Sequence, residues 1–244
     1  MGKTDPAVAD EVGYSTLQTI SSAGRFNHWM YETIAPYCSG KILEIGGGIG
    51  NISSFFLEAG QDLTVTELHE EYCTLVRERL SKQPTLRDVI TMDITDPNFD
   101  LLYQKLFGEF DTLFALNVIE HIEDRDLALS NCRKLLKPGG HLIILVPAFQ
   151  SLYNRFDTEL VHYLRFTKKS LQELVERNQF SLLQRKYFNF TGIFGWWLTG
   201  SILRRKIIPE GQMKLYDRLV PLFRLIDLVA SRFAGLSVII VAQK

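Results

Sequence analysis

Short apolar segments that are typical of strands alternate with helix-like segments from residue 41 onward. The predicted strands cover residues 41–45, 62–67, 88–93, 109–116, 141–147, 180–190 and 236–244. Strands that are apolar throughout and alternate with helices indicate a parallel sheet whose two faces are both covered. The chain is therefore expected to adopt an α/β fold, a doubly wound and mostly parallel sheet with helices on both faces.

The C-terminal end of the sequence argues for one domain. Residues 236–244 form an apolar strand, which must pair within the existing sheet. The mostly helical residues 191–235 are therefore expected to be a cap inserted before the last strand. A length of 244 residues and an apolar content of 46% fit one large globular domain. They exclude a disordered, collagen-like or disulfide-framework protein.

A glycine-rich loop follows the first predicted strand. Glycines at positions 46, 48 and 50 give the pattern GxGxG, and Asn51 stands where the dinucleotide pattern GxGxxG has its last glycine. Glycine lets the backbone turn sharply and approach a ligand without an intervening Cβ atom. The loop, preceded by Glu44, is therefore a candidate binding site of the nucleotide type.

Two further acidic residues stand at the ends of the second and third predicted strands. Glu67 lies 21 residues after Gly46, where a carboxylate can accept hydrogen bonds from both hydroxyls of a ribose. Asp93 is placed to accept one from the exocyclic amine of adenine. The carboxyl ends of parallel strands converge on one crevice at the switch point of the sheet. Taken singly, Glu67 also fits an N-cap of the next helix, and Asp93 also fits a turn.

The order of these motifs resembles a known family. The segments ILEIGGGIG, MDITD, NVIEHIED and LKPGGHLIILVP, together with Glu67, are similar to the successive motifs of class I S-adenosylmethionine-dependent methyltransferases. The most similar members are the small-molecule enzymes of ubiquinone and menaquinone biosynthesis. The resemblance covers about residues 26–147, and the final strand fits the family's antiparallel seventh strand. It implies a Rossmann-like sheet of seven strands; because residues 191–235 depart from the common core, it does not identify the methyl acceptor.

The resemblance also implies the cofactor and its contacts. S-adenosyl-L-methionine would be the cofactor and S-adenosyl-L-homocysteine the product of methyl transfer, by in-line displacement, to a small-molecule or lipid-linked acceptor. The implied cofactor contacts are Glu44 and the backbone of Gly46, Gly48 and Gly50 around the methionine part, Glu67 on the ribose, Leu68 beside the adenine, Asp93 and Ile94 on the adenine edge, and Asn117 against the methionyl part.

His121 is the candidate catalytic residue. It follows the end of the fourth predicted strand, and a histidine can change its charge near neutral pH, which suits removal of a proton from the acceptor. It also fits a residue that closes a turn and never touches the substrate. The candidate substrate contacts are Tyr153, Asp157 and His162 in the loop after the fifth strand, and Trp196 in the cap. The three loop residues also fit a solvated loop.

The predicted organisation is a single methyltransferase domain over residues 1–244. Its parts are an N-terminal helical lid (1–40), a cofactor-binding core (41–147), a substrate loop with a helix and the sixth strand (148–190), the helical cap (191–235) and the final strand (236–244). Because lids over the cofactor are often built from the N-terminal segment in this family, Tyr14, Asn27 and Trp29 are secondary candidates for ligand contacts.

The net charge of −1 conceals an asymmetry along the chain. Residues 1–159 carry a net charge of −10, and residues 160–232 carry a net charge of +8. In the cap, Trp196–Trp197 precede the basic run Arg204–Lys206, a combination typical of a peripheral membrane element. Peripheral contact with a membrane through residues 191–232 is one interpretation of the asymmetry. The other is that the two parts neutralise one another across an internal contact.

Residues 212–231 repeat apolar positions at helical spacing, which indicates core packing more often than a membrane face. Pro221 is expected to kink this helix or to split it in two.

The expected location is the cytoplasm, peripheral to the inner membrane surface. Cys38, Cys73 and Cys132 lie far apart, and free thiols of this kind fit a reducing compartment. The first ten residues show no secretory signal pattern. No ligand cluster at metal-site spacing is present along the sequence, so no metal is expected.

Two alternative functions compete with methyl transfer. One is a dinucleotide-dependent oxidoreductase on the same sheet, against which the missing third glycine and the acidic residue before the loop both argue. The other is a membrane-peripheral binding module whose cofactor site is vestigial. A nucleic-acid substrate is disfavoured, because the fourth strand ends in NVIE and not in the Asn/Asp-Pro-Pro-aromatic turn of DNA amino-methylating enzymes.

Overall fold

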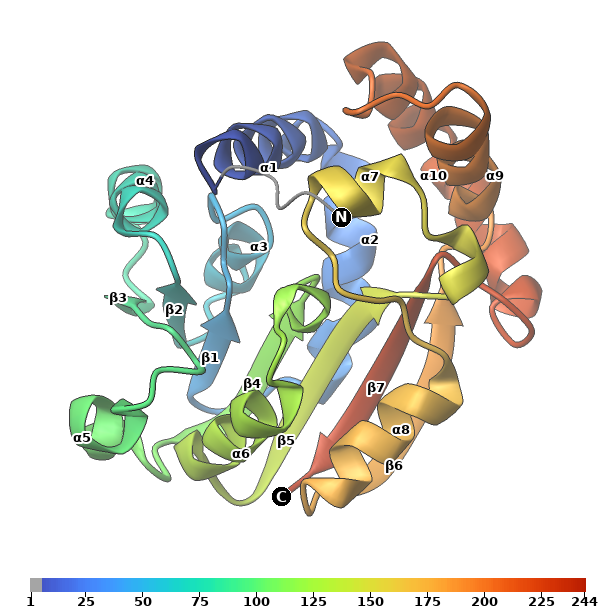
Figure 1. Cartoon of the computed structure of the whole chain (residues 1–244). Coiled ribbons are helices and arrows are strands. Elements are labelled where there is room, and N and C mark those ends of the chain that lie inside the picture. Colours follow the sequence, from blue (N-terminus) through green and yellow to red (C-terminus); the bar gives the residue numbers. More distant parts are fainter. Residues whose placement is uncertain (1–5) are drawn as a thin grey trace.

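The computed structural model describes residues 6–244, and its centre is a seven-stranded sheet with the order β3-β2-β1-β4-β5-β7-β6 (Figure 1). The strands are β1 (Ile42–Ile45), β2 (Leu63–Glu67), β3 (Leu86–Thr91), β4 (Phe110–Leu116), β5 (Leu136–Pro147), β6 (Ser181–Phe188) and β7 (Ser237–Gln243). Strands β1 to β5 pair in parallel, whereas β7 runs antiparallel to β5 and to β6. The expected seven-stranded α/β sheet is confirmed, as a mixed sheet.

Helices cover both faces of the sheet, as the alternation predicts. Those before the cap are α1 (Pro6–Ser21), α2 (Gly24–Ile34), α3 (Ser53–Glu58), α4 (Glu70–Leu80), α5 (Phe99–Tyr103), α6 (Arg125–Leu135), α7 (Arg155–Glu159) and α8 (Lys168–Arg177), with short 3-10 turns at Ala35–Tyr37, Gln104–Leu106, Ile119–His121 and Gln150–Leu152. Adjacent β5 residues face opposite cores: Leu142 packs in the core that includes α6 and α8, and Ile143 in the core that includes α2, α3 and α4. The strands are therefore apolar throughout because both of their faces are buried.

Strand β5 begins at Leu136, five residues earlier than predicted. Leu136 is fully buried and pairs with Phe110 of β4. Pairing with β4 therefore starts strand β5 before the continuous apolar run at residues 141–147. Local sequence could not reveal it, because Pro138, Gly139 and Gly140 disfavour strands when considered alone.

The cap is helical, as expected. It consists of α9 (Gly192–Trp196), a π-helical segment (Trp197–Ile202) and α10 (Glu210–Ala230). Helix α10 is continuous through Pro221, so the predicted split is wrong. The helix is held along its length by α2: the Phe26 N–H donates to Asp217 over 2.9 Å, and Arg224 pairs with Glu32 over 2.5 Å. These contacts on both sides of Pro221 support the helix where the proline cannot donate a hydrogen bond.

Helices α1, α7, α9 and α10 gather at the carboxyl ends of the parallel strands, at the top of Figure 1. Within residues 6–244, no helix combines the length and the apolar character that crossing a membrane requires. The first five residues of the predicted N-terminal lid lie outside the described part of the chain.

Candidate active site

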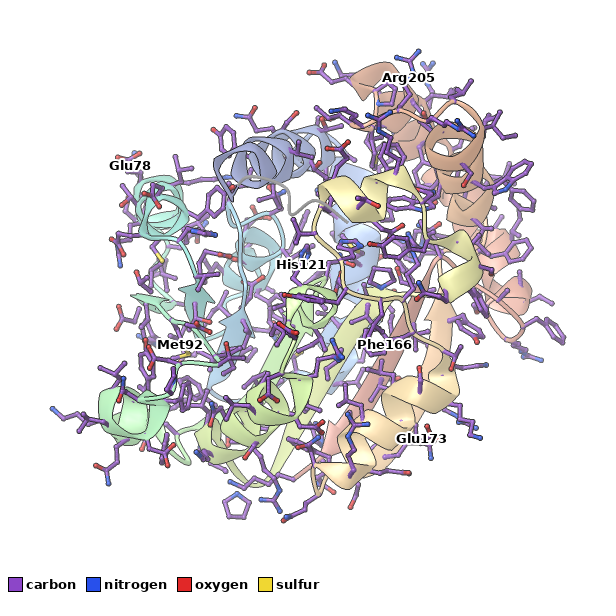
Figure 2. All side chains as sticks on the ribbon, viewed as in Figure 1. Glu78, Met92, His121, Phe166, Glu173 and Arg205 are labelled. Atoms are coloured by element: carbon purple, nitrogen blue, oxygen red, sulfur yellow. The ribbon has the colours of Figure 1, made fainter. Side chains whose placement is uncertain are left out.

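A cleft of about 1130 Å³ lies at the carboxyl ends of the parallel strands, bounded by residues of α1 and of the cap. Its floor includes the glycine loop (residues 46–50) and the ends of β2, β4 and β5. The strand order reverses between β1 and β4, so the cleft lies at the switch point where open α/β sheets bind ligands. Figure 2 shows His121 near the centre of the molecule and Arg205 at the outer edge of the cap.

The glycine loop adopts a backbone that side chains would obstruct. Gly46 has a φ of +71°, and a Cβ atom there would lie 2.5 Å from a methyl carbon of Val118. Gly48 has a φ of +55° and donates its N–H to Glu67 over 2.8 Å. Both residues line the cleft, whereas Gly50 packs behind it. The loop therefore exposes its backbone to the cleft, as the GxGxG pattern predicts.

Glu44 is buried at the end of β1, beside the glycine loop. Its carboxylate accepts a hydrogen bond from the hydroxyl of Ser53 over 2.5 Å. Burial raises the pKa of Glu44 to about 7, with a smaller contribution in the same direction from the charge of Glu67, while Ser53 opposes the shift. A cation placed nearby would favour the ionised form and lower this pKa again.

Glu67 ends β2 and faces the cleft. Its two oxygens accept hydrogen bonds from the N–H groups of Gly48 and Leu68, both over 2.8 Å. Helix α4 receives no side-chain cap, so the N-cap interpretation of Glu67 is wrong. Leu68, next in sequence, is 53% exposed and lines the cleft, leaving an apolar surface beside the carboxylate.

Asp93 follows β3 in a turn. One of its oxygens accepts hydrogen bonds from the N–H and the hydroxyl of Thr95, both over 2.7 Å, so the turn interpretation is confirmed. The side chain is exposed and also lines the cleft, which keeps its second oxygen compatible with a ligand contact. Ile94 is buried beside it and contributes an apolar part of the wall.

Asn117 stands directly after β4 with a φ of +55°, a left-handed conformation that asparagine tolerates better than most residues. Its N–H donates to the carbonyl of Leu145 over 2.8 Å, which fixes the turn to β5. The exposed side chain of Asn117 lines the cleft. It stands at the end of β4, the strand next to β1 in the sheet.

His121 both closes a turn and lines the cleft. Its N–H donates to the carbonyl of Val118 over 2.9 Å in the 3-10 turn after β4. Desolvation in the cleft wall, together with the neighbouring His162, lowers the pKa of His121, while a backbone hydrogen bond to Leu160 opposes the shift. The ring is therefore neutral at physiological pH, which differs from the expected change of charge near neutral pH.

His162 lies beside His121 in the cleft wall. The two rings meet edge to face, with centroids 4.6 Å apart. Glu120 joins them, and one ligand atom from each of the three side chains lies within 4.8 Å of the others. We call Glu120, His121 and His162 the histidine cluster. The sequence shows no such grouping, because His162 comes from a loop 41 positions after His121.

A buried ionic network holds His162 from behind. Nδ1 of His162 lies 2.8 Å from a carboxylate oxygen of Asp157, and Nε of Arg165 donates to the same oxygen over 2.7 Å. Burial alone would raise the pKa of Asp157, but His162 and Arg165 lower it below its usual range. Asp157 is fully buried and does not line the cleft. The structure thus places Asp157 behind His162 and away from the cleft surface.

Of the two remaining candidate substrate contacts, one lines the cleft and the other supports a loop behind it. Trp196 lines the cleft, and its ring stacks on the Arg165 guanidinium at 4.6 Å, which ties the cap to the buried network. Tyr153 does not line the cleft; its hydroxyl donates to the backbone carbonyl of His162 over 2.7 Å. Tyr153 therefore braces the loop that carries His162.

Of the three secondary candidates in the N-terminal segment, only Asn27 lines the cleft. Asn27 lines the cleft and donates to the carbonyl of Ile20 over 2.9 Å. Trp29 packs in the core against Phe188, with ring centroids 4.5 Å apart. Tyr14 lies outside the lining and stacks on Tyr72.

Sequence reasoning missed several lining residues. Glu120 stands inside the NVIEHIED segment, and its position beside His121 was the only local signal. Arg165 gave no signal, because an isolated arginine in a loop normally stays solvated. Further missed residues belong to α1 and α10, among them Thr16, Leu17, Ile20, Gln212, Met213 and Tyr216.

Comparison with known proteins agrees with this geometry. Residues 43–142 match the family model described as "Methyltransferase domain". A ubiquinone/menaquinone biosynthesis C-methyltransferase, UbiE, of Paracoccus denitrificans is 26% identical over 166 residues, which cover 61% of this chain and 62% of that protein. A ubiquinone biosynthesis O-methyltransferase of Pseudomonas aeruginosa is 26% identical over 117 residues, or 48% of each chain. The chain thus matches less than two thirds of the length of these curated relatives.

Solved structures show the same fold. A SAM-dependent methyltransferase from Archaeoglobus fulgidus has a TM-score of 0.59 at 17% identity and covers 89% of this chain and 94% of its own. Phosphoethanolamine N-methyltransferase 2 of Haemonchus contortus, bound to phosphomonomethylethanolamine and S-adenosylhomocysteine, has a TM-score of 0.63 at 18% identity, over 97% of this chain and 59% of that one. Residues 43–142 therefore match a methyltransferase domain, and the chain resembles the UbiE-type, class I S-adenosylmethionine-dependent methyltransferases.

Proposed function

We propose that this chain transfers a methyl group from S-adenosyl-L-methionine to a small-molecule or lipid-linked acceptor. The observation that carries the proposal is the convergence of Glu44, the glycine loop, Glu67 and Asp93 on one cleft, each at the carboxyl end of a strand or just after it. This arrangement supplies a backbone cradle, a ribose acceptor and an adenine acceptor in strand order.

The cofactor would lie along the strand ends from β3 to β4. Adenine would lie between Leu68 and Ile94, with its amine toward Asp93, and Glu67 would bind the ribose hydroxyls. The methionine part would lie over Gly46 and Gly48, near Glu44 and Asn117. Its ammonium and sulfonium charges would then face a buried carboxyl group whose pKa is raised to about 7, and they would favour its ionised form.

Helix α1 supports the proposed role of the N-terminal segment as a lid. Leu17 lies over the glycine loop, at 3.1 Å from the position that a Cβ atom would take on Gly48. The Asn51 side chain donates to the Leu17 carbonyl over 3.2 Å. A lid in contact with the loop would exclude water from the bound cofactor and align its methyl group.

Methyl transfer requires little beyond alignment. The acceptor atom attacks the methyl carbon in line, the S–CH₃ bond breaks with its electrons on sulfur, and the sulfonium becomes a neutral thioether. Reacting atoms about 3–3.5 Å apart define the near-attack geometry that the cleft must enforce. Neutral His121, on the acceptor side, is our candidate for direct contact with the acceptor, and the other candidate contacts are His162 and Trp196.

The cleft has room for an acceptor beside the cofactor. Its volume of about 1130 Å³ exceeds the roughly 300–1,000 Å³ that is usual for a pocket holding one small ligand. The side away from the glycine loop is lined by apolar and aromatic groups of the loop after β5 and of the cap, including Phe156, Trp196, Met213 and Tyr216. Such a lining suits a hydrophobic or lipid-linked acceptor.

We also propose that the cap contacts an anionic membrane surface, through which a lipid-linked acceptor would reach the cleft. Large apolar side chains are exposed on the cap, among them Trp197 at 50%, Leu228 at 70% and, in the turn after α10, Phe233 at 77%. The adjacent run Arg204–Lys206 is exposed as well. Apolar side chains beside cations suit the boundary between lipid tails and anionic headgroups.

Vesicle co-sedimentation tests the membrane contact. The chain is expected to pellet with anionic vesicles at low salt, and replacement of Arg204, Arg205 and Lys206 by Gln should release it. Replacement of three exposed lysines elsewhere by Gln (Lys82, Lys105 and Lys169) removes the same charge and should leave binding intact. Equal loss in both triple variants, or failure of the unaltered chain to bind, would remove the membrane contact and leave methyl transfer standing.

Calorimetric titration with S-adenosylhomocysteine tests the cofactor site. Glu67→Ala should weaken binding by about 1–3 kcal/mol, or roughly 5- to 150-fold, because a buried charged hydrogen bond is lost. Glu71→Ala, which removes an exposed carboxylate four residues later, should bind like the unaltered chain. Preference for NADH over S-adenosylhomocysteine would instead favour the oxidoreductase alternative.

A further inference from the structure

The histidine cluster presents three metal-binding side chains to one point in the cleft wall. One ligand atom each from Glu120, His121 and His162 lies within 4.8 Å of the others. A carboxylate with two imidazoles is a donor set that divalent transition metals take in proteins. The three side chains come from the turn after β4 and from the loop after β5, so the sheet itself fixes their approach.

Glu120 lacks the partners that a buried carboxylate needs. The residue has no exposed surface, and neither carboxylate oxygen accepts a hydrogen bond from any other residue of the described chain. Burial of an ionised carboxylate without compensation costs several kcal/mol, so such a group normally pairs, binds a metal or takes up a proton. A bound cation would satisfy both oxygens.

His162 is already oriented as a ligand. Its Nδ1 is engaged with Asp157 at 2.8 Å, which leaves Nε2 as the free ring nitrogen. Asp157 is in turn fixed by Arg165 at 2.7 Å and by the N–H of Asn154 at 2.9 Å. Metal-binding histidines almost always have their second ring nitrogen held by a carboxylate, carbonyl or water in this way.

We propose that Glu120, His121 and His162 bind one divalent transition-metal ion, with zinc as the model occupant. Zinc bonds of about 2.0–2.2 Å to nitrogen and oxygen place tetrahedral ligands roughly 3.4 Å apart, so the cluster contracts when the ion binds. The three residues would supply three ligands of a tetrahedral ion, and the fourth position would be open to the cleft that the exposed His121 lines. An open position is the mark of a catalytic metal site.

The role of this ion rests on the proposed methyl transfer. An acceptor hydroxyl on the open position would be more acidic than in water, because the ion stabilises the oxyanion. The O–H proton leaves to water, the oxygen electron pair forms the new bond to the methyl carbon, and the S–CH₃ electrons remain on sulfur. The site thus points to a hydroxyl-bearing acceptor and to O-methylation.

Metal titration of the chelator-treated chain tests the site without any acceptor. Calorimetry with Zn²⁺, and visible absorption with Co²⁺, should both show one saturable site per chain. His121→Ala and His162→Ala should each weaken Zn²⁺ binding by roughly 100-fold or more, and Asp157→Asn by about 10- to 100-fold. His28→Ala is the matched control, because His28 also lies beside a carboxylate, Glu32 at 3.5 Å, but on the surface. It should bind Zn²⁺ like the unaltered chain.

S-adenosylhomocysteine titration of the same variants separates the two proposals. Variants that keep its affinity are folded, so their loss of Zn²⁺ binding reports on the metal ligands. Absence of a saturable Zn²⁺ site in a chain that binds S-adenosylhomocysteine would overturn the metal site alone. Zn²⁺ binding unchanged in His121→Ala and His162→Ala would overturn it as well. A Zn²⁺ site in a chain that fails to bind S-adenosylhomocysteine would instead contradict the proposed function.

Discussion

The two sides of the cleft are built in different ways. The cofactor side consists of backbone and single side chains at strand ends, with Gly46 and Gly48 next to Glu67. The acceptor side consists of an interlocked set of side chains, in which His162, Asp157, Arg165 and Trp196 each contact the next. The sheet alone can position the first side, whereas the second depends on pairing between remote loops and the cap. Substitutions on the two sides should therefore have separable effects.

The largest expected effect on stability is on the acceptor side. Arg165→Met should lower the free energy of unfolding by about 3–5 kcal/mol, because it leaves the fully buried Asp157 without its guanidinium partner. Urea denaturation measures this change. Arg177→Met is the matched control: Arg177 also holds an aspartate, Asp126, but the pair is exposed, so the loss should stay within about 1 kcal/mol.

The affinity of Arg165→Met for S-adenosylhomocysteine sharpens the comparison. If the two sides are separable, the folded variant should bind S-adenosylhomocysteine within a few-fold of the unaltered chain. A loss as large as that of Glu67→Ala would show that the cofactor side depends on the buried network after all.

On the cofactor side, Gly46→Ala should weaken S-adenosylhomocysteine binding by roughly 100-fold, or about 2.7 kcal/mol. Its Cβ atom would lie 2.5 Å from Val118 and displace the loop over which we propose that the cofactor lies. Gly60→Ala is the control, because Gly60 has a similar φ of +74° but open space around it. Calorimetry should find unchanged affinity for Gly60→Ala, although both variants carry the strain of a left-handed alanine.

Glu44 gives the cofactor side a pH dependence. Its folded-state pKa of about 7 lies above its ordinary value, so the folded chain retains a proton that the unfolded chain has released. The contribution of Glu44 to stability is therefore fully present below its ordinary pKa, and is lost as pH rises toward and through about 7. Glu44→Gln should flatten this part of the stability profile by roughly 1–3 kcal/mol, measured by urea denaturation between pH 5 and about 8. An unchanged profile would show that Glu44 is ionised in the folded chain.

The smallest expected effect concerns the contact between Trp196 of the cap and Arg165 of the buried network. Trp196→Leu keeps an apolar side chain but removes the ring that stacks on Arg165 at 4.6 Å. The free energy of unfolding should fall by about 0.5–2 kcal/mol. Thermal unfolding of this variant beside Trp197→Leu, whose ring is half exposed, measures the difference. Equal changes would mean that the stacked pair does not hold the cap.

The cleft positions of the proposed cofactor side could be predicted from sequence because its residues follow strands that local patterns reveal. Glu67 and Asp93 stand at strand ends, and parallel pairing brings strand ends together. The acceptor side could not, because Glu120 and His162 meet only after β4 and β5 have paired. The early start of β5 at Leu136 and the continuity of α10 through Pro221 have the same cause, since in each case tertiary contacts override local preference.

A crystal structure with bound S-adenosylhomocysteine tests the central claim most directly. The ribose hydroxyls should lie within hydrogen-bond distance of the Glu67 carboxylate, and the sulfur should face the space bounded by His121 and Trp196. A ligand bound away from the glycine loop, or with its sulfur directed away from His121 and the cap, would contradict the division of the cleft into a cofactor side and an acceptor side.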